Sequence, residues 1–168
     1  MPRALAGRRG LLLCWLGWCL LLGLVAARRI VALQPGDPDD FMRLLEVRDW
    51  LAGQSWWDVR QYRMNPPAGA DMHWSRLVDA PLWLCEVLLR PLLGGPLAEQ
   101  VAMVVVPLLT LGCAMLLAAR LAWRLLDAEA IFFVAVLLAL ATPVTAQLQP
   151  LRIDHHGWQI VAGLAALN

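Results

Sequence analysis

The chain has 168 residues, of which 60% are hydrophobic; it contains nine tryptophans and no lysine, and its mean hydropathy is +0.60. This composition lies outside the range of ordinary water-soluble domains and inside the range of membrane proteins. A formal net charge of +1 excludes nucleic acid as a partner, because a protein that follows phosphates carries a basic stripe.

The first apolar run begins at Gly10 and lies in a span predicted over about 10–33, which meets the roughly 20 residues that a helix needs to cross a bilayer. Its basic start and small residues near its end are also typical of a cleaved signal peptide. However, the run is longer than the apolar core of a signal peptide. Arg28 and Arg29 also follow it where a cleavage site is small and uncharged. These features favour an uncleaved anchor.

A long loop over about 34–99 follows the first span. It opens with QPGDP, which is typical of a turn, and either Asp39 or Asp40 is placed to cap a helix from Phe41 to Leu51. The apolar residues of that helix form a broad face, so we expect it to lie on or against the membrane helices.

The rest of the long loop has two parts. Residues 54–79 show little helical or strand periodicity, and their aromatic side chains suit a bilayer interface. Residues 80–96 are apolar but short, and Pro91 interrupts them. We predict an interfacial or re-entrant helix there rather than a full span.

Two further spans are predicted over about 100–126 and 130–147, and an outer loop over about 148–156 leads to the start of a fourth span at 157–168. The fourth run has the composition of a membrane helix but about half the length. We therefore expect residues 1–168 to be a single N-terminal membrane region of a longer chain. The predicted fold class is an all-α integral membrane protein with a large helical outer loop between its first two spans.

Arginine placement near the span ends predicts the orientation, because basic residues accumulate on the cytoplasmic side. Five arginines place the N-terminus and the turn after the second span in the cytoplasm: Arg3, Arg8, Arg9, Arg120 and Arg124. Arg28 and Arg29 oppose this orientation. The two polar loops then share the outer face of a bacterial-type inner (plasma) membrane.

The two outer loops each carry a cluster of polar residues beside a predicted helix. Asp37, Asp39 and Asp40 precede the helix of the long loop, and Asp154, His155 and His156 precede the fourth span. Carboxylates and imidazoles together are ligands for a divalent metal. Taken singly, the first cluster also fits a turn with a helix cap and the second fits a solvated loop. On one face of the membrane, together they favour a site.

The order of elements resembles the GT-C membrane glycosyltransferases, and in particular the family of the oligosaccharyltransferase catalytic subunit. In that family an Asp after the first helix precedes an aromatic residue and a helix that ends like R-D-x-[IL]-x-G. The stretch DDFMRLLEVRDWLAG is similar, with Asp39 in the catalytic position and Arg48, Asp49, Leu51 and Gly53 in the tail. The second family motif, D-x-[DE], is matched by Asp154, whereas His156 replaces the second acid.

The resemblance implies transfer of a sugar from a polyprenyl-phosphate-linked donor, with Mg²⁺ or Mn²⁺ as the cofactor and an unknown acceptor. It implies that Asp39 is the catalytic carboxylate and a metal ligand together with Asp154 and His156. Donor phosphate would meet the guanidinium group of Arg152 and that of Arg43, although a surface ion pair is an equally good role for either arginine. Additional candidates for the site are Asp40, His155, His73 and Trp74, the last two because polar groups beside an aromatic ring suit a sugar.

A non-catalytic membrane protein is the alternative interpretation. A transporter or an assembly subunit would use the outer loop to bind a partner or a metal. Transporters, however, tend to carry ionisable residues near the middle of the membrane, and the predicted spans are almost free of them. Catalysis at the membrane surface therefore fits the sequence better.

Overall fold

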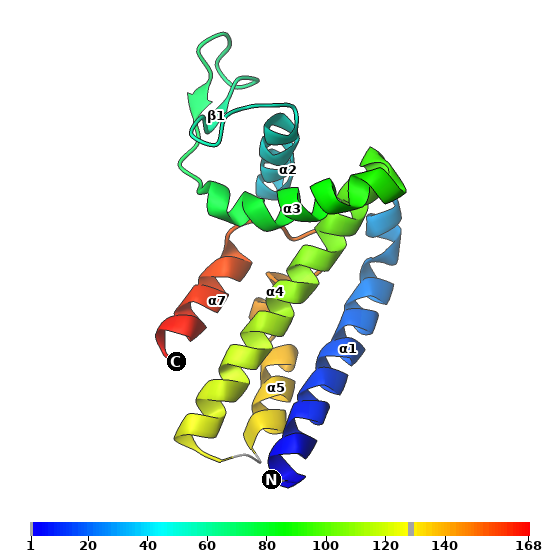
Figure 1. Cartoon of the computed structure of the whole chain (residues 1–168), viewed down its shortest axis with the longest axis vertical. Coiled ribbons are helices and arrows are strands. Elements are labelled where there is room, and N and C mark those ends of the chain that lie inside the picture. The colour runs from blue at the N-terminus through cyan, green and yellow to red at the C-terminus, as the bar shows by residue number, and fades with distance from the viewer. Residues whose placement is uncertain (1, 128–129) are drawn as a thin grey trace.

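The computed structural model describes residues 2–127 and 130–168, and this part of the chain is mostly helical (Figure 1). Its elements in chain order are α1 (Pro2–Val31), α2 (Pro38–Leu51), β1 (Arg60–Gln61), β2 (Ala70–Asp71), α3 (Arg76–Leu93), α4 (Gly95–Leu125), α5 (Ala130–Leu140), α6 (Thr142–Ala146) and α7 (His156–Ala166).

Two of these helices are long and apolar enough to cross a membrane. They are the Gly7–Val31 part of α1, with 25 residues, and α4, with 31 residues. At about 1.5 Å of rise per residue, both exceed the roughly 30 Å of a bilayer core. Only 6% of the apolar window of α1 is buried, against 50% of that of α4. Helix α4 therefore lies at the centre of the helical layer, and α1 lies at its edge.

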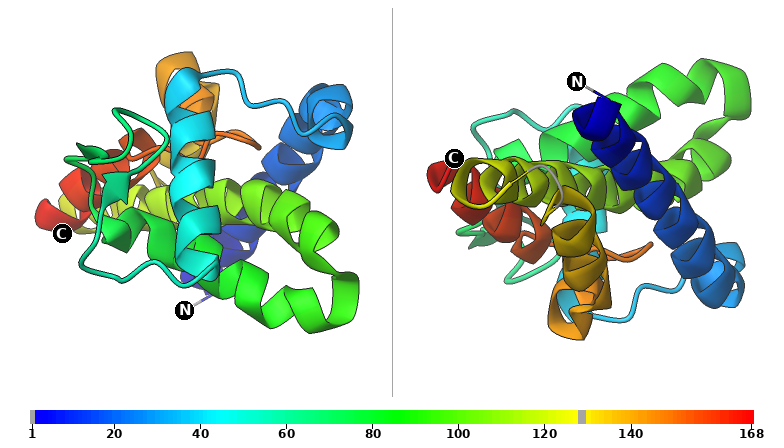
Figure 2. Two further views of the ribbon diagram at one scale, coloured as in Figure 1. Left: turned by 90° about the horizontal axis from the view of Figure 1, so that it is seen from above. Right: turned by 90° about the horizontal axis from the view of Figure 1, so that it is seen from below.

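Figure 1 shows α1, α4, α5 and α7 running alongside one another, with α3 lying across their upper ends. Small residues line the packed face of α4, which lets neighbouring helices approach closely. Ala114 and Ala135, on α4 and α5, are fully buried in a cluster with Leu111, Met115 and Leu148. The view from above in Figure 2 shows α2 crossing over α3, so these two helices form a cap over one end of the bundle.

Helix α2 starts earlier than the sequence predicted. Asp37 is its N-cap, and the Asp37 side chain accepts a hydrogen bond of 3.0 Å from the backbone N–H of Asp39. Pro38 occupies the first turn, where its missing N–H costs nothing. The prediction that Asp39 or Asp40 caps this helix was wrong, because the cap lies before the proline and both residues fall inside the helix.

The inner face of α2 packs on the upper ends of the bundle. Leu44 and Val47 share a core cluster with Leu82 of α3 and Met103 of α4. Leu151, in the loop before α7, belongs to the same cluster and is fully buried. This cluster joins the long loop to the loop before α7, and it places α2 against α3 and α4, as the broad apolar face of α2 predicted.

A small antiparallel hairpin occupies part of the segment for which the sequence showed no periodicity. Strand β1 pairs with β2 in the register Arg60↔Asp71 and Gln61↔Ala70. The Arg60 and Asp71 side chains form an exposed ion pair of 2.7 Å across the hairpin. With only two residues in each strand, the hairpin leaves no alternating pattern in the sequence, and this is why it was not predicted.

The third predicted span is interrupted. We expected one helix over about 130–147, but α5 ends at Leu140 and α6 is a separate helix of 5 residues. Pro143 lies in the first turn of α6. Proline lacks a backbone N–H and disfavours a helical conformation in the residue before it, so the chain bends here.

Candidate functional site

The start of α2 meets the loop before α7 through the carboxylate of Asp40. One Asp40 oxygen accepts hydrogen bonds from the backbone N–H groups of Ile153, at 2.8 Å, and Asp154, at 3.1 Å. The other accepts a hydrogen bond of 3.1 Å from Arg152. Asp40 is fully buried. The two polar loops, more than a hundred residues apart in sequence, therefore form one site, and Asp40 joins them.

Arg152 lies among three carboxylates. Its guanidinium is 2.8 Å from Asp37, 3.1 Å from Asp40 and 2.7 Å from Asp154. The side chain of Gln147 accepts a further hydrogen bond of 3.0 Å from Arg152. We call the set Asp37, Asp40, Arg152 and Asp154 the acidic-loop cluster. Its positive centre is a guanidinium, placed where the sequence interpretation placed a metal ion.

Two histidines and a tryptophan continue from this cluster. The backbone N–H of His156 donates to Asp154 at 2.9 Å, and the two histidine rings lie 4.4 Å apart between centroids. The His155 ring is 6.1 Å from that of Trp74, which comes from the loop before α3. His73 packs edge-on against Trp74 at 5.9 Å. The structure thus brings His73, Trp74, His155 and His156 beside the acidic-loop cluster.

Arg43 lies beneath the Trp74 ring, with its guanidinium carbon 4.8 Å from the ring centroid. The side chain is fully buried and forms a short ion pair with Asp79. Its Nε and Nη2 atoms are buried and have no hydrogen-bond partner among the described residues. The Nδ1 atom of His155 is in the same condition. These groups leave unused hydrogen-bonding capacity, most of it cationic, beside Trp74.

Arg43 belongs to a second group of charged side chains, all of them buried. We call this group the buried ion-pair cluster: Arg43, Glu46, Arg76 and Asp79. Arg76 is held by backbone oxygens, at 3.0 Å from that of Glu46 and 2.7 Å from that of Asp58. Burial and the neighbouring Asp79 raise the pKa of Glu46 to about 7, although Arg43 and Arg76 oppose the rise. Burial likewise raises the pKa of Asp79.

The carboxyl groups of the acidic-loop cluster differ in electrostatics. A backbone hydrogen bond from Asp39 and the side chain of Arg152 lower the pKa of Asp37. Burial raises the pKa of Asp40, and the Ile153 N–H and Arg152 oppose this effect. Burial and the charge of His156 lower the pKa of His155, so the neutral imidazole is favoured there.

Asp39 is the candidate with the fewest contacts. It is half-buried, and among the described residues its carboxylate makes no hydrogen bond or ion pair. Its charge acts on the pKa of His155, which places it on the same side as the histidines. The expected approach of Asp39 and Asp154 stays a prediction, since it is Asp40 whose carboxylate contacts the second loop.

The described residues contain no group of three or more His, Cys, Asp or Glu side chains that could hold a metal ion. The predicted ligands Asp154 and His156 approach each other to 4.0 Å, but Arg152 binds the same Asp154 oxygen. The residues present do not fit a Mg²⁺ or Mn²⁺ ion in this arrangement. The divalent cofactor stays a prediction that no ligand group among the described residues supports.

Sequence reasoning missed Glu46, Arg76 and Asp79. A signal for them exists, because Arg43 and Glu46 on α2 and Arg76 and Asp79 on α3 are oppositely charged pairs three residues apart. In both helices the pair falls on the face that carries apolar residues, where an unpaired charge is expensive. Two such pairs on adjacent helices indicate a buried network.

No protein-family profile matches the chain, and neither does any curated protein or solved structure. The chemistry of the site follows from its groups. Arg43 and His155 have unused hydrogen-bonding atoms, and apart from the His156 N–H, which donates to Asp154, the first turn of α7 has no side-chain cap. Cationic groups and a helix N-terminus favour an anion with several oxygens.

Proposed function

We propose that the chain is part of a membrane glycosyltransferase that uses a polyprenyl-phosphate-linked sugar as its donor. One observation carries the proposal: the buried guanidinium of Arg43 has two unpartnered nitrogens beside His155, at the end of two helices long enough to cross a membrane. Such a place suits a ligand whose phosphate lies at the membrane surface and whose chain lies in the lipid. A buried charge with unused donors is costly unless a ligand uses them.

Arg43 is the best-placed phosphate ligand. The guanidinium of Arg152 is already shared among three carboxylates, so it orders the loop before α7 and leaves the donor phosphate to Arg43. His155 and the α7 N–H groups that follow His156 supply further donors. This assignment separates the two arginines that the sequence treated alike.

Asp39 is the proposed base. In the transfer, the acceptor oxygen forms a bond to the anomeric carbon of the sugar, and the bond from that carbon to the phosphate oxygen breaks. The acceptor proton passes to the carboxylate of Asp39, and the phosphate leaves with the bonding electron pair. Arg43 stabilises the negative charge that develops on the leaving phosphate. No other described residue hydrogen-bonds to the Asp39 carboxylate, which leaves it available for this role.

Only part of the Trp74 ring is free to contact a sugar. One face of its ring lies over Arg43, and His73 packs edge-on against it. Trp74 therefore covers Arg43, the residue proposed to bind the donor phosphate. Any contact between Trp74 and the sugar uses the remaining edge of the ring. His73 is exposed and is free to meet a sugar hydroxyl.

The test uses the natural full-length protein in bacterial membranes and measures consumption of polyprenyl-phosphate-linked hexoses. Asp39→Asn should lower turnover by about 10²–10⁴, the usual contribution of a general base. Arg43→Gln should weaken donor use at least tenfold, by our estimate about 1.4 kcal/mol or more. The matched controls are Asp71→Asn and Arg63→Gln, which change exposed residues away from the site. Turnover that is unchanged in Asp39→Asn, or absent with every such donor, would reject the proposal.

A further inference from the structure

Three arginines gather at the end of the bundle opposite the candidate site. Arg8 lies near the start of α1, and Arg120 and Arg124 lie near the end of α4. All three are exposed, and none of them forms an ion pair with another described residue. Asp127, the acidic residue closest along the chain, lines neither of the cavities described next. The lining of this end of the groove between α1 and α4 therefore includes three guanidinium groups and no acidic side chain among the described residues.

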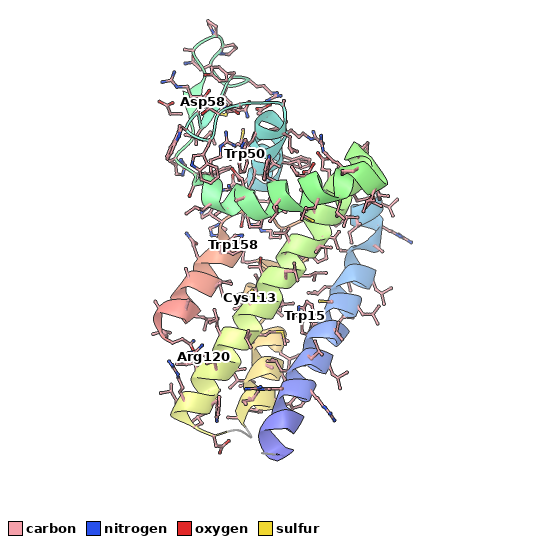
Figure 3. The ribbon with its side chains drawn as sticks, in the orientation of Figure 1. Trp15, Trp50, Asp58, Cys113, Arg120 and Trp158 are labelled. Atoms are coloured by element: carbon pink, nitrogen blue, oxygen red, sulfur yellow. The ribbon has the colours of Figure 1, made fainter. Side chains whose placement is uncertain are left out.

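Two adjoining cavities open between α1 and α4 at these arginines. The first, of about 480 Å³, is lined by all three arginines, by Trp123 and by apolar residues. The second, of about 580 Å³, shares Arg8, Leu11 and Leu116 with the first and continues to Trp15 and Cys113. Figure 3 labels Trp15 and Cys113 at mid-length of the two helices and Arg120 nearer their lower end. The result is one groove, basic at one end and apolar along its length.

We propose that this groove binds an anionic phospholipid of the leaflet on the N-terminal side of the membrane. The headgroup phosphate lies among Arg8, Arg120 and Arg124, and an acyl chain follows the apolar wall toward Trp15. The inference rests on the membrane placement in the proposed function and is independent of sugar transfer, because the groove lies at the other end of the bundle (Figure 1).

Charge complementarity selects this occupant. A further helix or a second copy of the chain would fill the apolar wall, but it would also have to bring acidic groups to neutralise three guanidinium groups. A lipid supplies the negative charge and the chain together, and basic pockets between spanning helices on this side of a membrane are known lipid sites. Trp15, which lines the groove, donates a hydrogen bond of 2.8 Å to the Leu108 carbonyl of α4.

The experiment compares lipid binding by the chain purified in detergent and titrated with phosphatidylglycerol or phosphatidylcholine, using native mass spectrometry and thermal melting. We expect at least tenfold tighter binding of phosphatidylglycerol. The triple variant Arg8→Gln, Arg120→Gln, Arg124→Gln should lose that preference. The three side chains are exposed and unpaired within the described chain, so their replacement leaves the packing intact.

The matched control removes the same charge elsewhere on the chain, in the triple variant Arg9→Gln, Arg28→Gln, Arg29→Gln, none of which lines the groove. It should keep the preference. If both triple variants lost the phosphatidylglycerol preference equally, the preference would come from general surface charge, and the proposal would be overturned. Equal binding of the two lipids by the wild-type protein would also overturn the proposal. A change from dimer to monomer in the groove variant would do the same, because it would mean that a second copy of the chain covers the groove. Alkaline extraction reports membrane insertion separately, and donor turnover should be unchanged in both variants.

Discussion

Asp39 and Asp40 are neighbours in the chain with opposite surroundings. Asp40 points its oxygens at backbone N–H groups and Arg152 in the core of the site, whereas the Asp39 carboxylate has no hydrogen bond among the described residues. A helix turns its side chains by about 100° per residue, so adjacent residues cannot share one environment. At the scale of residues, Asp40 therefore has a structural role, and the adjacent Asp39 has the proposed chemical role.

Replacement of Asp40 should therefore damage the fold, while replacement of Asp39 should damage only activity. Asp40→Ala leaves Arg152 with one partner fewer and two buried N–H groups unpaired, which should cost about 3–5 kcal/mol. Asp39→Ala should change the free energy of unfolding by less than about 1 kcal/mol. Chemical denaturation in detergent, followed by circular dichroism, measures both. Equal stabilities in the two variants would contradict the assignment.

The raised pKa of Glu46 predicts a loss of stability with rising pH. An unfolded glutamate releases its proton near its ordinary value of 4.5, whereas the folded protein retains it up to about 7. Between these pH values the unfolded state binds fewer protons, so raising the pH favours unfolding, by up to about 3 kcal/mol. Below pH 4.5 both states are protonated and the effect is absent.

Glu46→Gln should reduce this pH dependence, since glutamine cannot lose a proton. Part of the dependence should persist, because burial also raises the pKa of Asp79. The exposed variant Asp71→Asn is the control and should keep the wild-type slope. Melting temperatures measured from pH 4.5 to pH 8 decide the matter. If melting temperature falls with pH equally steeply in Glu46→Gln and wild type, Glu46 is not the source of the pH dependence.

At the scale of elements, helix α7 is held by a close approach at its first turn. A Cβ on Gly157 would lie 3.0 Å from the backbone oxygen of Gln147 and 3.0 Å from a methyl carbon of Leu148. The backbone oxygen cannot easily move, because the loop that carries it is fixed through Leu148 and Leu151, which are fully buried. The glycine thus sets how close α7 and the Asp154 loop come to the bundle.

Gly157→Ala should lower the free energy of unfolding by about 1–3 kcal/mol, as overpacking does. Gly163→Ala, in the same helix, is the control: nothing lies within 4 Å of its added Cβ, so it should stabilise the helix by up to about 1 kcal/mol. Denaturation of the two variants side by side tests the contrast. Two effects of the same sign would show that the approach at Gly157 is looser than described.

Elements were predicted with uneven success, for physical reasons. Apolar length predicted α1 and α4, and the apolar face of α2 predicted its packing. The start of α2 was misplaced, because a proline after Asp37 was interpreted as part of a turn when it occupies the first turn of the helix. The hairpin was missed because its strands are too short to show a period of two. Long apolar patterns can be recognised in a sequence. A single helix cap or a pair of very short strands depends on local contacts that the sequence pattern does not show.

The candidate site shows the same division. Topology alone predicted that the loops beginning near Gln34 and Leu148 would meet, and the Asp40 contacts are consistent with this. The partner of each charge was not predictable, since a carboxylate can bind either an arginine or a metal ion, and here Arg152 binds Asp40 and Asp154. Which of two neighbouring carboxylates is buried depends on the rotation of the helix, and the packing of Leu44 and Val47 in the core cluster sets that rotation.

At the scale of the whole molecule, the two ends of the bundle differ in charge and should lie on opposite sides of a membrane. The acidic-loop cluster lies at one end, and the exposed groove arginines lie at the other (Figure 1). Single cysteines at Ser55 and Gln149 should react with a membrane-impermeant reagent from outside, in a chain without its native cysteines. A cysteine at Leu126 should react only after permeabilisation. Protection of Ser55 or Gln149 before permeabilisation would contradict the shared outer face.

The most direct test of the central claim is equilibrium binding of a polyprenyl-phosphate-linked hexose to the purified full-length protein, which needs no acceptor. The account predicts at least tenfold weaker binding in Arg43→Gln and a smaller loss in His155→Ala, a variant that leaves the Arg43–Asp79 ion pair in place. Arg63→Gln, an exposed arginine paired with Asp49, should bind like wild type. Equal affinity in all four proteins would mean that the buried guanidinium is a structural group, and the proposed donor site would not exist.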